Sequence, residues 1–281
     1  MKITVLGSAA AEGIPSLWCN CETCRQAKLL GGKDIRRRTS YLIDDDTLVD
    51  LGPDFLWQVT AFNIDTVKLK QVVYTHSHFD HESPMELRWR CEGFADKVQG
   101  TLQLYGNEQV HDFLMSLWNY CTHGHADFSA NKCNFNVLEF GVPCQADNLQ
   151  ILPLKANHDT AEKCMLHLLT RNGKTVFISH DTGIYPDETW KLLEGKHIDL
   201  AFFDCTGGVD PVFGRNENHH SGGYTDAKLR QRLLEMGCLT EKTPCYVNHF
   251  SHNAHSLHHQ MEEVLNPLGL QVAYDGLTIE L

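Results

Sequence analysis

The chain carries the stretch Thr75-His76-Ser77-His78-Phe79-Asp80-His81 directly after the apolar run Gln71-Val72-Val73-Tyr74. The apolar run is typical of a buried strand, so the histidines stand on the loop at its end. Three imidazoles and a carboxylate this close together cannot all face one point, but they can divide between two metal ions. A pattern as long as HxHxDH behind an apolar run favours a dinuclear hydrolytic centre over chance histidines on a polar loop.

A dinuclear centre needs further ligands at other strand ends, and the chain supplies them. Asn157-His158-Asp159 follows the apolar run 149–154, and Ser179-His180-Asp181 follows the run 175–178. Asn248-His249 follows Cys245-Tyr246-Val247. In this order the motifs resemble the metallo-beta-lactamase-fold hydrolases, in which HxHxDH is followed by a single His, a single Asp and a final His.

The resemblance implies two ligand sets joined by one carboxylate: His76, His78 and His158 for the first ion, Asp80, His81 and His249 for the second, and Asp181 between them. His180 matches no ligand position and is interpreted as a structural or supporting histidine. His and Asp ligands accept Zn, Mn or Fe, so the sequence predicts two divalent ions, Zn or Mn, without deciding between them.

A narrower resemblance, to the PhnP-type phosphodiesterases of the carbon-phosphorus lyase pathway, rests on further segments: 6–15, 19–24, Leu87-Arg88-Trp89, 248–252 and Tyr274-Asp275-Gly276. The amino-terminal part also resembles PqqB, a protein of pyrroloquinoline quinone biosynthesis. PqqB proteins carry a degenerate HxHxDH loop, whereas the loop here is intact. The phosphodiesterase branch is therefore favoured.

A cysteine cluster, Cys19-Asn20-Cys21-Glu22-Thr23-Cys24, has chemistry of its own. Three thiolates suit a tetrahedral structural Zn, which needs a fourth ligand to close its coordination. A disulfide is the alternative, but it would leave one cysteine unpaired, and a CxC bridge is strained. The resemblance implies His252 as the fourth ligand. The other cysteines are scattered and are expected to be mostly buried small hydrophobic residues.

Charge limits the class of substrate. Asp and Glu outnumber Lys and Arg by 36 to 24, for a net charge of -12, whereas a nucleic-acid-binding protein needs basic residues along the phosphate track. A small phosphodiester is therefore expected as partner rather than tRNA, although a short oligonucleotide stays open. The basic run Arg36-Arg37-Arg38 is either a solvated loop or a local anion-binding edge.

Cysteine usage and hydropathy suggest the compartment. An odd number of cysteines, 11, argues for a reducing environment. No charged leader precedes an apolar run, and no apolar stretch approaches the roughly 18 to 20 residues of a membrane span. We expect a cytoplasmic protein without a membrane partner. A homodimer is compatible with the sequence.

The order of elements predicts an α+β fold, a four-layer αβ/βα sandwich, formed by one domain over residues 1–281 because ligands from His76 to His249 must converge. The expected strands are 2–6, 47–50, 71–74, 101–105, 149–154, 164–170, 174–178, 198–203, 245–248 and 270–280. The expected helices are 107–119, 186–194, 225–236 and 255–265.

One segment departs from a compact sandwich. Residues 119–137 resemble a loop-rich insertion and contain several metal-ligand types: Cys121, His123, His125, Asp127 and Cys133. These side chains are interpreted as incidental rather than as a further metal site, because His and Cys in polar loops commonly are. The segment could instead be a lid that shapes substrate access.

The expected reaction is hydrolysis of small phosphodiesters, cyclic ones included, to monoesters, since two divalent ions make hydroxide available near neutral pH. Asn218-His219-His220-Ser221-Gly222 resembles the family's HxS-type motif, which places a non-ligand histidine beside the phosphate. His219 is assigned as general acid or phosphate contact, with His220 as its rival and a structural pair as the alternative. Asp80 is placed in the catalytic group. Hydrolysis of a thioester or lactam, or a PqqB-like accessory role in cofactor biosynthesis, are the alternative functions.

Overall fold

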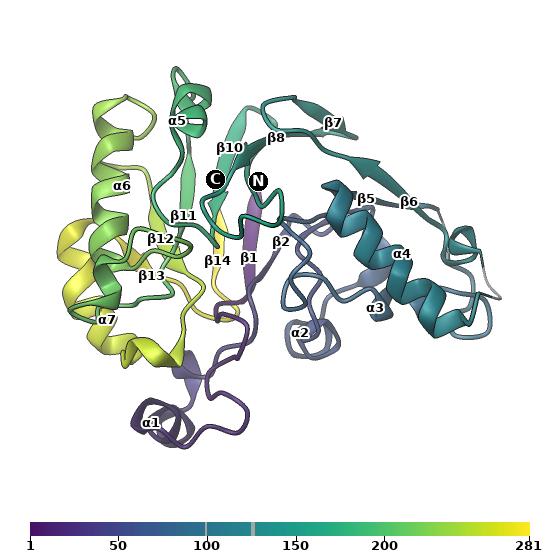
Figure 1. Cartoon of the computed structure of the whole chain (residues 1–281), viewed down its shortest axis with the longest axis horizontal. Coiled ribbons are helices and arrows are strands. Elements are labelled where there is room, and N and C mark those ends of the chain that lie inside the picture. The colour runs from purple at the N-terminus through teal and green to yellow at the C-terminus, as the bar shows by residue number, and fades with distance from the viewer. Residues whose placement is uncertain (99, 125–126) are drawn as a thin grey trace.

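The computed structural model describes residues 1–98, 100–124 and 127–281, and within them the chain forms two seven-stranded sheets that face each other. Helices cover the outer face of each sheet (Figure 1). This is the αβ/βα sandwich that the sequence predicts, and the fold class is confirmed.

The first sheet is built mainly from the amino-terminal half. Its strands run, in spatial order, β14 (Thr278–Glu280), β1 (Lys2–Gly7), β2 (Ser40–Ile43), β3 (Thr47–Val49), β4 (Gln71–Val73), β5 (Leu102–Gly106) and β6 (Cys133–Val137). The pairings are antiparallel from β14 to β3 and parallel from β3 to β6.

The second sheet repeats this plan with the carboxy-terminal half. Its strands run β13 (Gln271–Val272), β12 (Cys245–Asn248), β11 (Leu200–Asp204), β10 (Lys174–Ser179), β9 (Met165–Arg171), β8 (Leu149–Lys155) and β7 (Cys144–Ala146). The pairings are parallel from β13 to β10 and antiparallel from β10 to β7. The parallel strands of both sheets end on loops that carry the histidine and aspartate motifs.

The strands are apolar on both faces because each sheet is covered twice. In β4, Val73 packs between the two sheets while its neighbour Val72 packs under the outer helices. In β10, Ile178 and Phe177 divide in the same way. Successive side chains of a strand point to opposite faces, so a continuous apolar run is what a central strand of this sandwich requires.

The helices form the two outer layers. Beside the first sheet lie α2 (Phe55–Phe62), α3 (Met85–Arg88) and α4 (Glu108–Thr122), and beside the second lie α5 (Asp187–Leu193), α6 (Gly223–Glu235) and α7 (His258–Leu265). The helix α1 (Glu22–Leu30) begins within the cysteine cluster, with Cys21 as its N-cap and Cys24 in its first turn, and it projects from the sandwich (Figure 1). Among the described residues, no helix has the length and apolar character needed to cross a bilayer.

One expected strand is wrong, and one expected insertion contains regular elements. Residues 270–280 are not one strand: β13 and β14 belong to different sheets, and a turn at Tyr274–Gly276 separates them. Within the segment 119–137, residues 119–122 complete α4, Phe128–Asn131 form a single 3-10 turn and 133–137 form the edge strand β6. His125 lies outside the described residues. Cys121, His123, Asp127 and Cys133 belong to no metal-binding group among those described.

Neither interpretation of the basic run fits the structure. The guanidinium of Arg36 is buried and donates to Ser8 Oγ, to the carbonyl of Ala273 and to His258. Arg37 stacks on Trp57, and Arg38 forms an ion pair of 2.9 Å with Asp54. The run therefore fastens the amino-terminal loops to the sandwich. Its three guanidinium groups form contacts within the protein.

Candidate metal centre and active site

The predicted ligands converge at the edge where the parallel strands end. The HxHxDH loop follows β4, and His158, Asp181 and His249 follow β8, β10 and β12. Asp181 and His249 adopt left-handed backbone conformations, with φ of 53° and 61°. Non-glycine residues in this region are uncommon and concentrate at functional sites, because the surrounding structure must hold them there.

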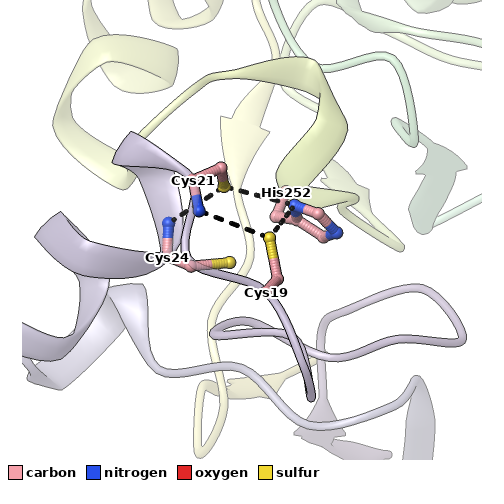
Figure 2. A group of neighbouring side chains, drawn as sticks. All are labelled: Cys19, Cys21, Cys24 and His252. Atoms are coloured by element: carbon pink, nitrogen blue, oxygen red, sulfur yellow. Dashed lines mark hydrogen bonds between the residues drawn. The ribbon is translucent and has the colours of Figure 1, made fainter.

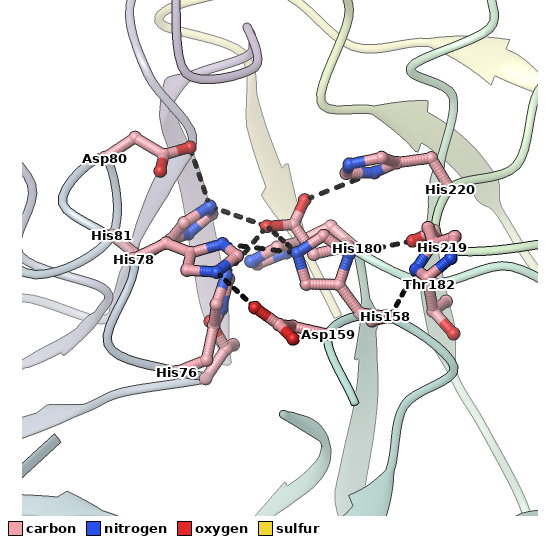
Figure 3. Close-up of polar contacts among 12 residues, drawn as sticks. His76, His78, Asp80, His81, His158, Asp159, His180, Thr182, His219 and His220 are labelled. Carbon is pink, nitrogen blue, oxygen red and sulfur yellow. Dashed lines mark hydrogen bonds and ion pairs between the residues drawn. The ribbon is translucent and has the colours of Figure 1, made fainter. Parts of the chain in front are cut away.

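The first ligand set comes together as expected. One nitrogen from each of His76, His78 and His158 lies within 4.8 Å of the other two. His78 Nδ1 lies 3.3 Å from His158 Nε2 (Figure 3). One ion could contact all three side chains.

The second set surrounds the Asp181 carboxylate. Asp181 Oδ2 lies 2.8 Å from His81 Nε2, and Asp181 Oδ1 lies 2.7 Å from His249 Nε2. Asp80 Oδ2 completes the set at 3.0 Å from His81 Nε2. Asp181 Oδ2 also lies 3.2 Å from His76 Nε2 in the first set, so this carboxylate occupies the bridging position that the sequence predicts.

The unpaired atoms of this cluster fit divalent metal ions. His76 Nε2, His81 Nε2, His249 Nε2 and Asp181 Oδ1 are buried without a hydrogen bond of acceptable geometry, although the nitrogens lie near carboxylate oxygens. Buried polar atoms are normally paired, so lone pairs that converge without hydrogen-bond geometry need another partner. Imidazole and carboxylate groups in this arrangement are donors for Zn, Mn or Fe.

Each ligand histidine is fixed through its other nitrogen. His76 Nδ1 lies 3.0 Å from Thr75 Oγ1, and His158 Nδ1 donates to the carbonyl of His219 at 2.9 Å. The remaining partners are Asp159 for His78, Asp50 for His81 and Thr206 for His249. Such partners set the tautomer and ring orientation of metal ligands, and the sequence did not single them out.

Asp50 is the most connected of the missed residues. It is fully buried at the end of β3 and accepts from the backbone N–H of Thr75 at 2.8 Å and from His81 at 2.7 Å. His180 Nε2 lies 3.0 Å from the same carboxylate. This contact agrees with the prediction that His180 is a structural histidine and not a metal ligand. The one available signal was an aspartate at the last position of the expected strand 47–50.

Glu162 clamps the HxHxDH loop from the loop after β8. Its carboxylate accepts from the backbone N–H of Ser77 at 2.6 Å and from Ser77 Oγ at 2.7 Å. Asn107, which caps α4, donates to the same carboxylate at 3.1 Å. Ser77 separates two ligand histidines, so this contact ties the first ligand set to both sheets.

We expect Glu162→Ala to weaken metal binding by about 10- to 100-fold, because Ser77 and Asn107 lose their shared acceptor. Glu162→Gln should retain most of the affinity, since the amide oxygen still accepts and the Ser77 hydroxyl can turn to accept. Metal titration of the purified variants measures this. Glu188→Ala, which removes an exposed partner of Lys155, is the control. Equal affinity in Glu162→Ala and the wild type would contradict the clamp.

A further group of candidate metal ligands joins the amino-terminal loop to the loop after β12. One ligand atom from each of Cys19, Cys21, Cys24 and His252 lies within 4.8 Å of the others (Figure 2). His252 Nδ1 lies 3.7 Å from Cys19 Sγ and 3.5 Å from Cys21 Sγ. Ligands at roughly 2.0 to 2.3 Å from a tetrahedral Zn stand about 3.5 to 4 Å apart, so the group matches the predicted structural zinc site.

The thiols of this group are unequal. Burial raises the pKa of Cys21, but the Cys24 backbone N–H and His252 outweigh it and lower the pKa to about 6. Burial raises the pKa of Cys24 to about 12. All cysteines described are free thiols, so the disulfide alternative finds no support. A cation would have to displace the Cys24 proton, which is the usual coupling of zinc binding to thiol ionisation.

If the group binds Zn, Cys21→Ser should remove one tightly held ion per chain and lower the melting temperature, because a closed structural site contributes directly to folding. Metal analysis after mild chelation and thermal unfolding test this. Cys144→Ser, at a half-buried cysteine outside every metal-binding group, is the matched control. An unchanged metal content in Cys21→Ser would reject the assignment.

The histidine pair lies beside the first ligand set. His219 is exposed, and its Nδ1 donates to the carbonyl of His158. His220 is half-buried, its Nδ1 lies 2.8 Å from Asp204, and its ring centre lies 4.6 Å from that of His158. Both histidines therefore use Nδ1 for support and leave Nε2 available (Figure 3). Asp204 and Thr206, which position His220 and His249, were not predicted.

A close backbone approach brings this pair to the metal-binding groups. A Cβ atom on Gly183 would lie 2.1 Å from the carbonyl oxygen of Glu217, so only glycine fits there. Ile184 N–H donates to that same carbonyl at 2.9 Å. The Asp181-Thr182-Gly183 segment thus carries the bridging carboxylate and also docks the loop of His219.

Together, the sandwich and the two ligand sets define a metal-binding hydrolase of the metallo-beta-lactamase fold. Residues 46–269 match the family model described as beta-lactamase superfamily domain, and the chain belongs to this family.

Two curated relatives have names that do not refer to phosphodiester hydrolysis. The chain is 25% identical over 282 residues to a protein named octanoyltransferase from Porphyromonas gingivalis, covering 99% of this chain and 51% of that protein. It is 26% identical over 175 residues to coenzyme PQQ synthesis protein B of Ectopseudomonas mendocina, covering 56% of this chain and 54% of that protein. The chain thus spans about half the length of the first relatives it matches.

Solved structures share the fold over the whole chain. A diphosphatase from the PhnP family superposes with a TM-score of 0.75 at 23% identity, covering 100% of this chain and 97% of the other. Zinc-bound PqqB from Methylobacterium extorquens gives 0.69 at 16% identity with full coverage of both chains. The short form of human tRNase Z gives 0.66 at 16% identity, covering 100% and 99%. At these identities the likeness concerns the fold alone, and the predicted resemblance to both PhnP and PqqB is confirmed.

Proposed function

We propose that the protein hydrolyses small phosphodiesters, cyclic diesters included, to monoesters with the help of two divalent metal ions. The observation that carries this proposal is the His219–His220 loop. It is fastened by hydrogen bonds to the carbonyl of His158 and to Asp204, directly beside the first ligand set. Generic metal-dependent hydrolysis does not need such a pair, but a diester with a poor leaving group does.

The two ligand sets would hold the ions, with Asp181 shared between them. Divalent ions bound there supply Lewis acidity toward the phosphoryl oxygens and lower the pKa of a bound water. The chain contributes the rest. Asp50, Asp159 and Thr206 keep the ligand imidazoles in one tautomer and orientation, so that little reorganisation is needed when charge develops.

His219 is the proposed general acid. A carbonyl can only accept, so His219 Nδ1 must carry the hydrogen shared with His158 O, and Nε2 is the atom free to deliver a proton. His220 is the alternative, since Asp204 supports its Nδ1 in the same manner. Asp80 belongs to the second ligand set and would act in catalysis by helping to hold the second ion.

The charge of the protein supports a small substrate. A surplus of 12 negative charges repels a polyanion, and the run Arg36–Arg38 is occupied by internal contacts. The affinity of nucleic-acid enzymes depends on Lys and Arg along the phosphate track. A small diester needs only the metal-binding groups and one or two neighbouring side chains.

A second candidate is hydrolysis of a thioester, in line with the acyl-transfer name of the relative that aligns with 99% of this chain. The same metal-binding groups would then polarise a carbonyl oxygen. A PqqB-like accessory role is the third candidate. The intact HxHxDH loop and its complete set of supporting contacts speak against a role without catalysis.

A substrate panel separates these candidates. We expect the protein loaded with Zn or Mn to hydrolyse bis-p-nitrophenyl phosphate and cyclic diesters. Octanoyl thioesters and nitrocefin should remain intact. Asp181→Ala, which removes the shared carboxylate, should abolish the activity and controls for contaminating hydrolases. Thioester hydrolysis without diester hydrolysis would overturn the proposal in favour of the second candidate, and activity toward neither would favour the third.

His219→Ala should keep its metal ions but lose roughly 10²- to 10⁴-fold in kcat on a diester with an alkyl leaving group, because the departing alkoxide needs a proton. The loss should be much smaller with p-nitrophenolate, a leaving group that departs unprotonated. His220→Ala is the paired variant, and His197→Ala, far along the chain at an exposed position, is the control. Equal losses on both substrates would show phosphate binding instead. The leaving-group pattern in His220→Ala alone would transfer the role to His220.

A further inference from the structure

A carboxyl group that the proposed mechanism does not use lies behind the His219–His220 loop. Asp226, in the first turn of α6, is fully buried. Its Oδ1 lies 2.7 Å from Ser221 Oγ. Its Oδ2 is also buried and forms no hydrogen bond of acceptable geometry in the described part of the chain, and the Cys205 thiol is a second polar neighbour of the carboxyl group.

The contacts of Ser221 favour a protonated carboxyl group at Asp226. Ser221 Oγ lies 2.8 Å from the carbonyl oxygen of Asp204 as well as 2.7 Å from Asp226 Oδ1. The hydroxyl has one hydrogen, and a carbonyl oxygen can only accept. Once Ser221 donates to Asp204, the hydrogen in the contact with Asp226 must come from the carboxyl group. A carboxylate would leave two acceptors facing a single hydrogen.

We infer that Asp226 is a positioning residue that remains a protonated carboxylic acid and, by donating to Ser221, holds the histidine loop against Asp204. The protonation is argued from the buried, unpaired carboxyl oxygen and from the two acceptors that face the Ser221 hydroxyl. The positioning role rests on the proposed function, since it concerns His219 and His220.

The surroundings of Asp226 agree with a neutral acid. Burial, and then the nearby Asp204 carboxylate, raise the pKa of Asp226 well above its usual range. Among the described residues, no cationic side chain forms an ion pair with it. The start of a helix favours negative charge, but this effect is small beside the cost of burying an unpaired carboxylate.

The chain of contacts reaches from Asp226 to the active site. Asp204 accepts from Ser221 through its backbone carbonyl, while its carboxylate accepts from His220 Nδ1 at 2.8 Å and from Thr182 N–H at 3.2 Å. Thr182 is the neighbour of the bridging Asp181. When Asp226 donates to Ser221, the Ser221 hydroxyl is left to donate to the Asp204 carbonyl. Asp204 in turn orients both the histidine loop and the Asp181 loop.

Infrared spectroscopy of the metal-loaded protein, with aspartate labelled by ¹³C at its side-chain carboxyl, tests the protonation directly. The label separates aspartic acid from Glu82, whose pKa burial raises to about 10. At about pH 8, Asp275 is ionised, since burial raises its pKa only to about 6. We expect a labelled carboxylic-acid C=O band in the wild type that is lost in Asp226→Asn. Asp187→Asn, at the exposed first turn of α5, should retain the band.

Absence of that band from the wild type, or its persistence in Asp226→Asn, would overturn the inference whatever the substrate proves to be. Catalysis tests the positioning role. Asp226→Asn keeps a donor of the same shape and should retain near wild-type kcat on the substrate that the wild type hydrolyses. Asp226→Leu removes the donor and should lose about 10- to 100-fold. If Asp226→Leu does not fold, Asp226→Asn decides: a loss of that size there would overturn the positioning role.

Discussion

The buried carboxylate of Asp181 is the constraint on which the rest of the structure depends. It lies within 3.2 Å of imidazole nitrogens from the loop after β4 and from the loop after β12. Burying a carboxylate away from water costs free energy unless groups of opposite charge or hydrogen-bond donors lie close to it. The loops that meet it belong to different sheets, so the sandwich must close at this edge for Asp181 to be tolerated. The positions of the loops at these strand ends are therefore the most tightly constrained in the fold.

The same constraint explains why the site needs cations. Asp50, Asp80, Asp181 and Asp204 are all buried among the histidines. In the absence of metal, the negative charges of these acids would have to be balanced by protons on the neighbouring histidines, and although burial lowers the pKa of His249, Asp181 raises it to about 10. Metal binding would exchange protons for ions. A site that must expel protons to bind metal is strongly pH-dependent in affinity, independent of which substrate it serves.

The ligands could be predicted from the sequence because their motifs stand near the ends of apolar strands in the order of a known family, and strands that run in the same direction end at one edge of a sheet. Their supporting residues could not be predicted, because those contacts join segments far apart in the chain, such as Glu162 to Ser77 or Asp204 to His220. Arg36 was misread for a related reason. A run of arginines in a sequence shows where the charge lies but not whether it is buried. Nothing in the neighbouring sequence indicates that Arg36 forms hydrogen bonds with Ser8 and His258.

The cysteine group lies close in the chain to a residue of the proposed active site. His252 belongs to that group, and the residues just before it, from His249 onward, are paired along the amino-terminal loop: Phe250 N–H donates to Ser8, and Ala10 N–H donates to Phe250. Ser251 Oγ donates to Glu12. This short segment therefore carries one metal ligand at its start and the closing ligand of the structural group at its end. Because the left-handed backbone at His249 must be held from both sides, ordering of the cysteine loop is part of what keeps His249 directed at Asp181.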